Sequence, residues 1–168
     1  LGGGVLQGIN KAIELAEKDH RGLVIGNQAD NFSVGANLAM IMMMAAEQDW
    51  WDLNMAIKMF QDTMMRVRYS SIPVIVAPHG MTLGGGCEMT MHADKVVAAA
   101  EIYIGLVEVG VGVIPGGGGS KEFALRAAKN VIADDVKTNH LRDAFMNIAM
   151  AKVATSAYEA KNMGIIRD

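Results

Sequence analysis

Two long stretches of the chain carry apolar residues at helical spacing. Between residues 5 and 18 the apolar positions recur every three or four residues, with charged residues on the opposite face. Between Leu53 and Val67 the same spacing produces one apolar stripe, preceded by Asp52 as a candidate cap. We predict an amphipathic helix in each stretch and assign both apolar stripes to the core.

Short apolar runs rich in β-branched residues alternate with the helical stretches. Runs of this length between turn signals are typical of buried strands. Their alternation with helices predicts an α/β fold with a largely parallel sheet and right-handed crossovers. The predicted strands cover residues 23–26, 74–77, 95–99 and 102–105.

The C-terminal part of the chain predicts three more helices. Ser120 is a candidate cap for a helix that ends at Lys129, and a break at Asp134 and Asp135 and at residues 137–139 precedes another helix. A last short helix begins after Ser156, which has capping-box spacing to the acid three residues further on, and Gly164 is placed to end it. We interpret these elements as scaffold.

A triple glycine, Gly84 to Gly86, lies between the strand predicted at 74–77 and a short helix whose first turn carries Glu88. Bare peptide N–H groups at the start of a helix stabilise negative charge, and glycine lets a ligand approach them closely. The pattern therefore predicts a site for a ligand oxygen beside the Glu88 carboxylate. Taken alone, it also fits a flexible turn followed by a glutamate that offsets the helix dipole.

A second loop, residues 27–38, is rich in Asn, Asp, Ser and Gly and follows the strand predicted at 23–26. If the two strands are neighbours in a parallel sheet, the loops at their carboxyl ends lie at the same edge, where open α/β sheets bind ligands. Gly35 and Ala36 would then present a second peptide N–H toward the triple glycine.

Glu108 is the only charged residue between Glu101 and Lys121. A carboxyl group buried in such apolar surroundings has a raised pKa, which suits a proton donor, whereas an exposed loop acid is the alternative. The nearby Gly110 and Gly112 do not complete a dinucleotide fingerprint, because Pro115 stands where the third glycine belongs.

Composition limits the classes of protein and partner. The 168 residues, 51% hydrophobic and 20% charged, are enough for one domain with a sizeable core. A formal net charge of -3 with scattered basic residues argues against a nucleic-acid partner, and no apolar stretch reaches the ~18 residues of a membrane span. The single cysteine, Cys87, excludes an internal disulfide and fits a cytoplasmic location. The histidines form no close pair at metal-ligand spacing, so no metal is predicted.

Four segments in order resemble the motifs of the crotonase (enoyl-CoA hydratase/isomerase) superfamily: 32–38, 83–88, 105–108 and 113–119. The resemblance implies a right-handed spiral of ββα units, truncated at both ends. It is closest to the hydratase portion of bacterial bifunctional proteins that also carry a 3-hydroxyacyl-CoA dehydrogenase. We therefore expect residues 1–168 to be a partial domain excised from a larger multifunctional chain.

The resemblance also implies roles for individual residues. The peptide N–H groups of Ala36 and Gly85 would form an oxyanion hole for a thioester carbonyl, and Glu88 and Glu108 would be the catalytic carboxylates. No tightly bound cofactor is implied, because a coenzyme A thioester is the substrate. The residues expected to border that substrate are Ala36, Asn37, Leu38, Ala39, Gly84 and Gly85, with Asn37 standing where the family commonly has Asp.

The expected reaction is hydration of trans-2-enoyl-CoA to 3-hydroxyacyl-CoA in fatty-acid β-oxidation. Double-bond isomerisation on the same fold and a noncatalytic acyl-CoA-binding or scaffold domain are the alternatives. Expected partners are further copies of the chain or a dehydrogenase domain of the same chain. Met42, Met43 and Met44 lie in what reads as a looser stretch, where flexible thioethers suit a pocket for an acyl chain, covered by Trp50 and Trp51 unless these face a partner.

Overall fold

The computed structural model describes residues 1–129, 131–132 and 136–167. Helices and strands alternate along most of its length, as the apolar pattern predicts. In chain order the elements are α1 (Gly3–Asp19), β1 (Leu23–Ile25), α2 (Leu38–Ala46), α3 (Trp50–Arg68), β2 (Val74–Val76), β3 (Gly80–Leu83), α4 (Gly85–His92), β4 (Lys95–Val96), β5 (Glu101–Gly105), the 3₁₀ helix η1 (Glu108–Val111), α5 (Gly119–Lys129), α6 (Lys137–Ala149), β6 (Ala154–Ser156) and α7 (Ala157–Asn162).

The strands form two small sheets rather than one. In the first, β2 lies between β1 and β4 and pairs with both in parallel. In the second, β5 pairs in parallel with β3 and antiparallel with β6. The predicted α/β class and the largely parallel pairing are therefore confirmed, and the predicted neighbours β1 and β2 do pair.

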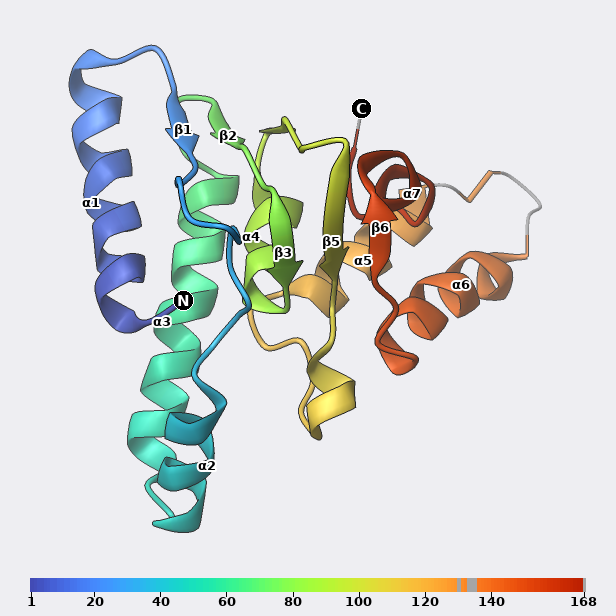
Figure 1. Cartoon of the computed structure of the whole chain (residues 1–168), viewed down its shortest axis with the longest axis horizontal. Helices are drawn as coiled ribbons and strands as arrows, with labels where there is room; N and C mark the ends of the chain where they lie inside the picture. The colour runs from blue at the N-terminus through green and yellow to red at the C-terminus, as the bar shows by residue number, and fades with distance from the viewer. Residues whose placement is uncertain (130, 133–135, 168) are drawn as a thin grey trace.

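Helix α4 lies between two hydrophobic clusters. Cys87 and Met91 pack into a cluster formed with β5, β6, α5 and α7, whereas Met89 and Ala93 pack into a cluster formed with α1, α3 and β2. Figure 1 shows α1 and α3 at one end of the molecule, α6 and α7 at the other, and α4 behind β3 in the middle. The two faces of α4 thus join the two halves of the core.

Several local predictions were wrong. The cap of α3 is Asp49, whose Oδ1 accepts a hydrogen bond from the Asp52 N–H at 3.3 Å, so Asp52 lies inside the helix. The apolar stripe of α3 is buried only toward its end: Ile57 is exposed, while Met64 and Val67 are buried. Ser120 lies within α5, which begins one residue earlier.

Other boundaries also differ from the predictions. Met42 to Met44 are helical, in α2, and not in a loose stretch. The predicted break at 137–139 is wrong, because α6 already begins at Lys137, whereas Asp134 and Asp135 lie outside the described residues. The cap of α7 is confirmed, because the Ser156 hydroxyl accepts the Glu159 N–H at 3.1 Å. Over the described ranges, no helix is both long and apolar enough to cross a membrane.

Candidate active site

The triple glycine opens α4, but it follows β3 and not the strand predicted before it. Gly84 caps the helix at φ +54°, a backbone conformation that favours glycine. Its N–H donates to the Gly105 carbonyl at 2.9 Å, so the end of β5 fixes the turn. The turn at Gly84 and Gly85, called the glycine junction below, therefore joins β3 to α4 and is held in place by the end of β5.

The second loop runs beside β3 and reaches this junction. Ser33 forms a parallel bridge with Thr82, and the Leu83 N–H donates to the Ser33 carbonyl at 2.8 Å. Two residues later, a Cβ placed on Gly35 would lie 3.4 Å from the Gly85 nitrogen. The two glycine-containing turns, about fifty residues apart in sequence, are thus in contact.

Two peptide donors at this contact are unpaired. Within the described part of the chain, neither the Ala36 N–H nor the Gly85 N–H donates a hydrogen bond. The Asn37 side chain caps α2 by accepting the Met40 N–H at 3.3 Å. The loop that carries Ala36 is therefore held after its free N–H by this cap and before it by the bridge from Ser33 to Thr82.

Glu88 is buried, with 1% of its surface exposed, and is held by a third glycine-rich segment. Its Oε1 atom accepts the N–H groups of Gly117 and Gly119 at 2.8 and 2.9 Å. Burial raises the pKa of Glu88 to about 7; the two peptide donors oppose this shift, and the charge of Glu108 adds to it. The sequence predicted Glu88 but not its donors, although the run of four glycines from Gly116 was the available signal.

Glu108, the first residue of η1, lies beside the same junction. A Cβ on Gly84 would be 3.3 Å from its Oε1 atom, so a larger residue at position 84 would press against the carboxyl group. Its Oε2 atom is buried and has no hydrogen-bond partner in the described part of the chain. Burial raises the pKa of Glu108 as well. The Glu108 carboxyl thus lies against Gly84, and its charge acts on the Glu88 carboxyl.

Phe60 of α3 was not predicted to contribute to the site. A Cβ on Gly117 would come within 2.2 Å of the Phe60 ring, and one on Gly85 within 2.9 Å. The ring thus lies directly against the backbone of both glycine segments. In addition, the Gln61 side chain donates to the Gly116 carbonyl at 2.8 Å, so α3 supports the segment that holds Glu88.

The remaining candidate groups are less suited to chemistry. Cys87 is fully buried, and burial raises the pKa of its thiol well above the usual range, so the reactive thiolate is disfavoured. No group of three His, Cys, Asp or Glu side chains able to hold a metal occurs among the described residues. The absence of a metal remains a prediction.

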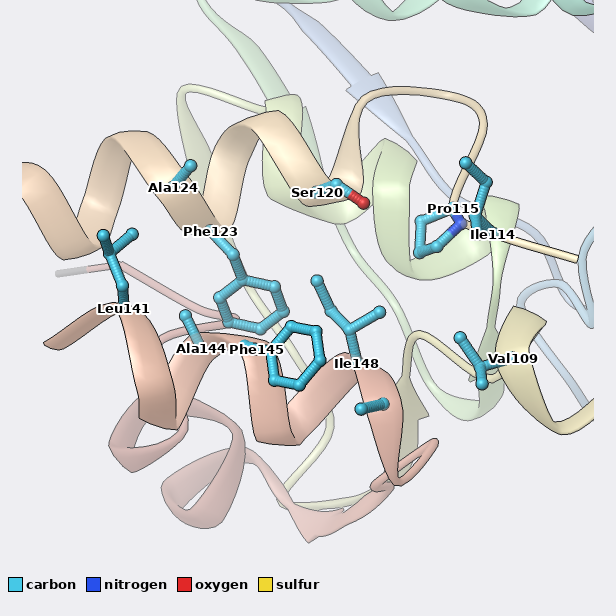
Figure 2. A pocket seen from close by; sticks show the side chains of 11 residues that line it. Val109, Ile114, Pro115, Ser120, Phe123, Ala124, Leu141, Ala144, Phe145 and Ile148 are labelled. Carbon is cyan, nitrogen blue, oxygen red and sulfur yellow. The ribbon is translucent and has the colours of Figure 1, made fainter. Parts of the chain in front are cut away.

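A separate apolar cavity of about 490 Å³ lies beside η1, between α5 and α6. Figure 2 shows Phe123 of α5 and Phe145 and Ile148 of α6 pointing into it, with Ile114 and Pro115 at one end. Neither carboxyl group lines it, and it does not include Met42 to Met44, of which Met42 is 71% exposed. The cavity is therefore distinct from the glycine junction.

Comparison with known proteins agrees with this geometry. The sequence profile of the family described as "Enoyl-CoA hydratase/isomerase" matches residues 3–168. A protein of Bacillus subtilis (strain 168), named "Probable 3-hydroxyacyl-CoA dehydrogenase", is 48% identical over 167 residues, which are 98% of this chain and 20% of that protein. The chain spans about a fifth of the length of the curated relatives that it matches.

Solved structures share the fold. An enoyl-CoA hydratase from Bacillus anthracis superimposes with a TM-score of 0.78 at 26% identity, over 99% of this chain and 59% of that one. An enoyl-CoA hydratase from Thermoplasma volcanium GSS1 gives a TM-score of 0.80 over 99% of this chain and 60% of that one; at 24% identity it shows the fold alone. Because the profile covers nearly the whole sequence and the fold agrees with it, the chain belongs to the enoyl-CoA hydratase/isomerase family.

Proposed function

We propose that this chain hydrates trans-2-enoyl-CoA thioesters to 3-hydroxyacyl-CoA. The observation that supports the proposal is the contact between two turns with free peptide donors, with the Glu108 carboxyl against Gly84 and its charge acting on the Glu88 carboxyl. Family membership supports the general reaction, and the presence of two acids favours hydration, which must both activate water and protonate carbon.

The oxyanion hole is proposed to consist of the Ala36 and Gly85 N–H groups. Addition of water to a conjugated thioester builds negative charge on the carbonyl oxygen, and donors already in place stabilise that charge in the transition state more than in the substrate. Gly85 gains further from the N-terminus of α4, where the helix dipole favours an anion. Loss of one such donor typically costs about 3 kcal/mol, or roughly a hundredfold in rate.

Glu88 and Glu108 are proposed to share the proton transfers. With both pKa values raised, and with the charge of Glu108 raising that of Glu88, the pair favours a state in which one acid keeps its proton near neutral pH. The ionised carboxylate takes a proton from water as the oxygen attacks the β-carbon, and the protonated one donates to the α-carbon. We assign the two residues to these steps jointly.

The coenzyme A portion is proposed to lie along Ala36 to Ala39, where the second loop enters α2, with Gly84 and Gly85 bordering the thioester. No tightly bound cofactor is required. Because the matched relatives are about five times longer and one is named as a dehydrogenase, we infer that residues 1–168 are a hydratase portion of a longer protein. A dehydrogenase domain or further copies of the chain are its proposed partners, and a cytoplasmic location stays a prediction.

The test follows hydration of crotonyl-CoA as the loss of absorbance of its conjugated enoyl thioester. Glu88→Gln and Glu108→Gln should each lower kcat by roughly a hundredfold or more, because each removes one proton-transfer group. The exposed Glu47, at the end of α2, provides a matched control, and Glu47→Gln should leave the rate unchanged. Full activity in the Glu88→Gln, Glu108→Gln double variant would refute the assignment, and conversion of a 3-enoyl thioester without hydration would assign an isomerase instead.

A further inference from the structure

A buried polar cluster lies on the side of α4 that faces α5. His92 and Glu122 are both fully buried, with 0% of their surface exposed. Glu122 is within 3.2 Å of Arg68 and of Lys121, and Arg126 is 3.4 Å away. Buried charges of this kind are costly unless they are paired, so the arrangement of these side chains is closely constrained. The proposed reaction uses none of them directly.

The contacts of His92 define its tautomer. Its Nδ1 atom is 2.7 Å from the Glu88 carbonyl oxygen, which can only accept, so Nδ1 carries the proton. The unprotonated Nε2 atom lies 3.1 Å from Lys121 Nζ and accepts from the ammonium group. Burial lowers the pKa of His92 to about 4, which keeps this tautomer neutral at pH 7. The imidazole therefore joins the backbone of Glu88 to the first turn of α5.

The same ring packs against the segment that holds the Glu88 side chain. Gly118 has φ +108°, and a Cβ placed on it would lie 3.1 Å from two ring atoms of His92. Its neighbours Gly117 and Gly119 are the residues whose N–H groups bind Glu88 Oε1. If the imidazole moved, Gly118 would lose this contact, and the Gly117 and Gly119 N–H groups on either side of it would be less firmly held on Glu88.

We propose that His92, held by Lys121, is a positioning residue that keeps the Gly117 and Gly119 N–H groups on the Glu88 carboxyl. Its Nδ1–H donates to the main-chain carbonyl of Glu88, while its ring packs against Gly118, between the two residues whose N–H groups bind the Glu88 side chain. Because a displacement of about 1 Å at a reacting group costs up to roughly a hundredfold in rate, such a support controls kcat and not substrate binding. This inference rests on the proposed role of Glu88.

The charged groups around Glu88 constrain the choice of variant. Glu108 acts on Glu88 from η1. The charged groups that act on His92 are Lys121 and Glu122 of α5 and Arg68 of α3. Replacing Lys121 changes the local charge as well as the contact. His92 is neutral, so His92→Phe removes both hydrogen bonds without changing the charge, and His92→Gln restores an acceptor toward Lys121. His20, exposed at the end of α1, supplies the matched control His20→Phe.

The test combines crotonyl-CoA kinetics with NMR of the protein. We expect His92→Phe to lower kcat about tenfold with KM within about twofold, and His92→Gln to recover part of the loss. The amide proton signals of Gly117 and Gly119 should move upfield, and the pKa of the ¹³C-labelled Glu88 carboxyl should rise, because hydrogen bonds to the carboxylate are weakened. His20→Phe should change none of these quantities.

Lys121 offers a second variant that is safer for folding, because its side chain is 40% exposed. Lys121→Met should move the two glycine signals in the same direction, whereas Lys129→Met, at the other end of α5, should not. Unmoved glycine signals in a folded His92→Phe or Lys121→Met protein would overturn the inference, as would a rise in KM alone. If the wild-type protein fails to hydrate crotonyl-CoA, the proposed function falls, but the NMR measurements still decide the role of His92.

Discussion

The carboxyl group of Glu88 is both buried and ionisable, so its chemistry affects folding. Its folded-state pKa of about 7 is above the ordinary value of 4.5, which means that the folded protein holds this proton more tightly than the unfolded chain. The free energy of unfolding should therefore fall as pH rises from about 4.5 to 7, by at most about 3 kcal/mol. The raised pKa of Glu108 acts in the same direction.

Glu88→Gln isolates this contribution, because glutamine resembles the protonated acid and keeps an oxygen for the Gly117 and Gly119 donors. The variant should match the wild type at pH 4.5 and be more stable at pH 8, while its activity is lost. Urea unfolding at the two pH values measures the difference. Equal stability of the two proteins at pH 8 would show that Glu88 ionises without cost.

The contact between Phe60 and Gly117 predicts a second effect at the scale of single residues. Gly117→Ala should destabilise the protein by about 1 to 3 kcal/mol, because the added methyl group overlaps the ring and approaches Glu88 Oε2. Phe60→Leu, which removes ring atoms, should recover part of that loss in the double variant. Thermal unfolding of the four proteins measures the coupling, and strictly additive effects would contradict the contact.

Sequence alone suggested the acids and turns of the candidate site but not the residues that pack against them. Glu88 stood out because it follows a glycine run, and Glu108 because no other charge lies near it in the sequence. The importance of Phe60 and His92 depends on what packs against them. Phe60 fits the apolar stripe of α3 and His92 ends α4, so spacing gives no reason to connect either with the glycines of residues 116–119.

At the scale of elements, the start of α3 shows how a cap is decided by geometry. Asp49 and Asp52 both suit a cap, but only Asp49 accepts an N–H of the first turn. Asp49 also raises the pKa of Asp52 through the proximity of like charges. Asp49→Ala should cost about 1 kcal/mol of stability, whereas Asp52→Ala should cost less because it removes repulsion. Thermal unfolding distinguishes them, and a larger loss for Asp52→Ala would reverse the assignment.

Strands β3 and β6 were not predicted, because they form by pairing with β5 and not from a local sequence pattern. The residues of β3 follow a proline and include Gly80, and they lack the β-branched run that identifies β2. They become a strand through pairing with β5 and the bridge to Ser33. Likewise β6 is three residues long and joins β5 across an irregular register. Patterns of local hydrophobicity therefore predicted the first sheet, β5 and much of the helical frame, but not β3 and β6 of the second sheet.

At the scale of the whole molecule, the candidate site lies where the two halves of the core meet. Helix α4 contributes buried side chains to both clusters, and the second loop leaves β1 of the first sheet to run beside β3 of the second. A ligand that binds both Ala36 and Gly85 would therefore bridge elements from both sheets. Its binding free energy should stabilise the molecule as one unit.

This arrangement makes a calorimetric prediction. A saturated thioester such as butyryl-CoA cannot be hydrated but has the carbonyl that the two N–H groups would bind. At a hundredfold excess over its Kd it should raise the free energy of unfolding by about 2.7 kcal/mol, within a single transition. Free coenzyme A at the same concentration lacks the thioester carbonyl and should produce a smaller rise in the free energy of unfolding. Equal rises in the free energy of unfolding for the two ligands would show that the oxyanion contacts add nothing to binding. A second unfolding transition whose temperature butyryl-CoA does not change would show that the site belongs to one half of the core.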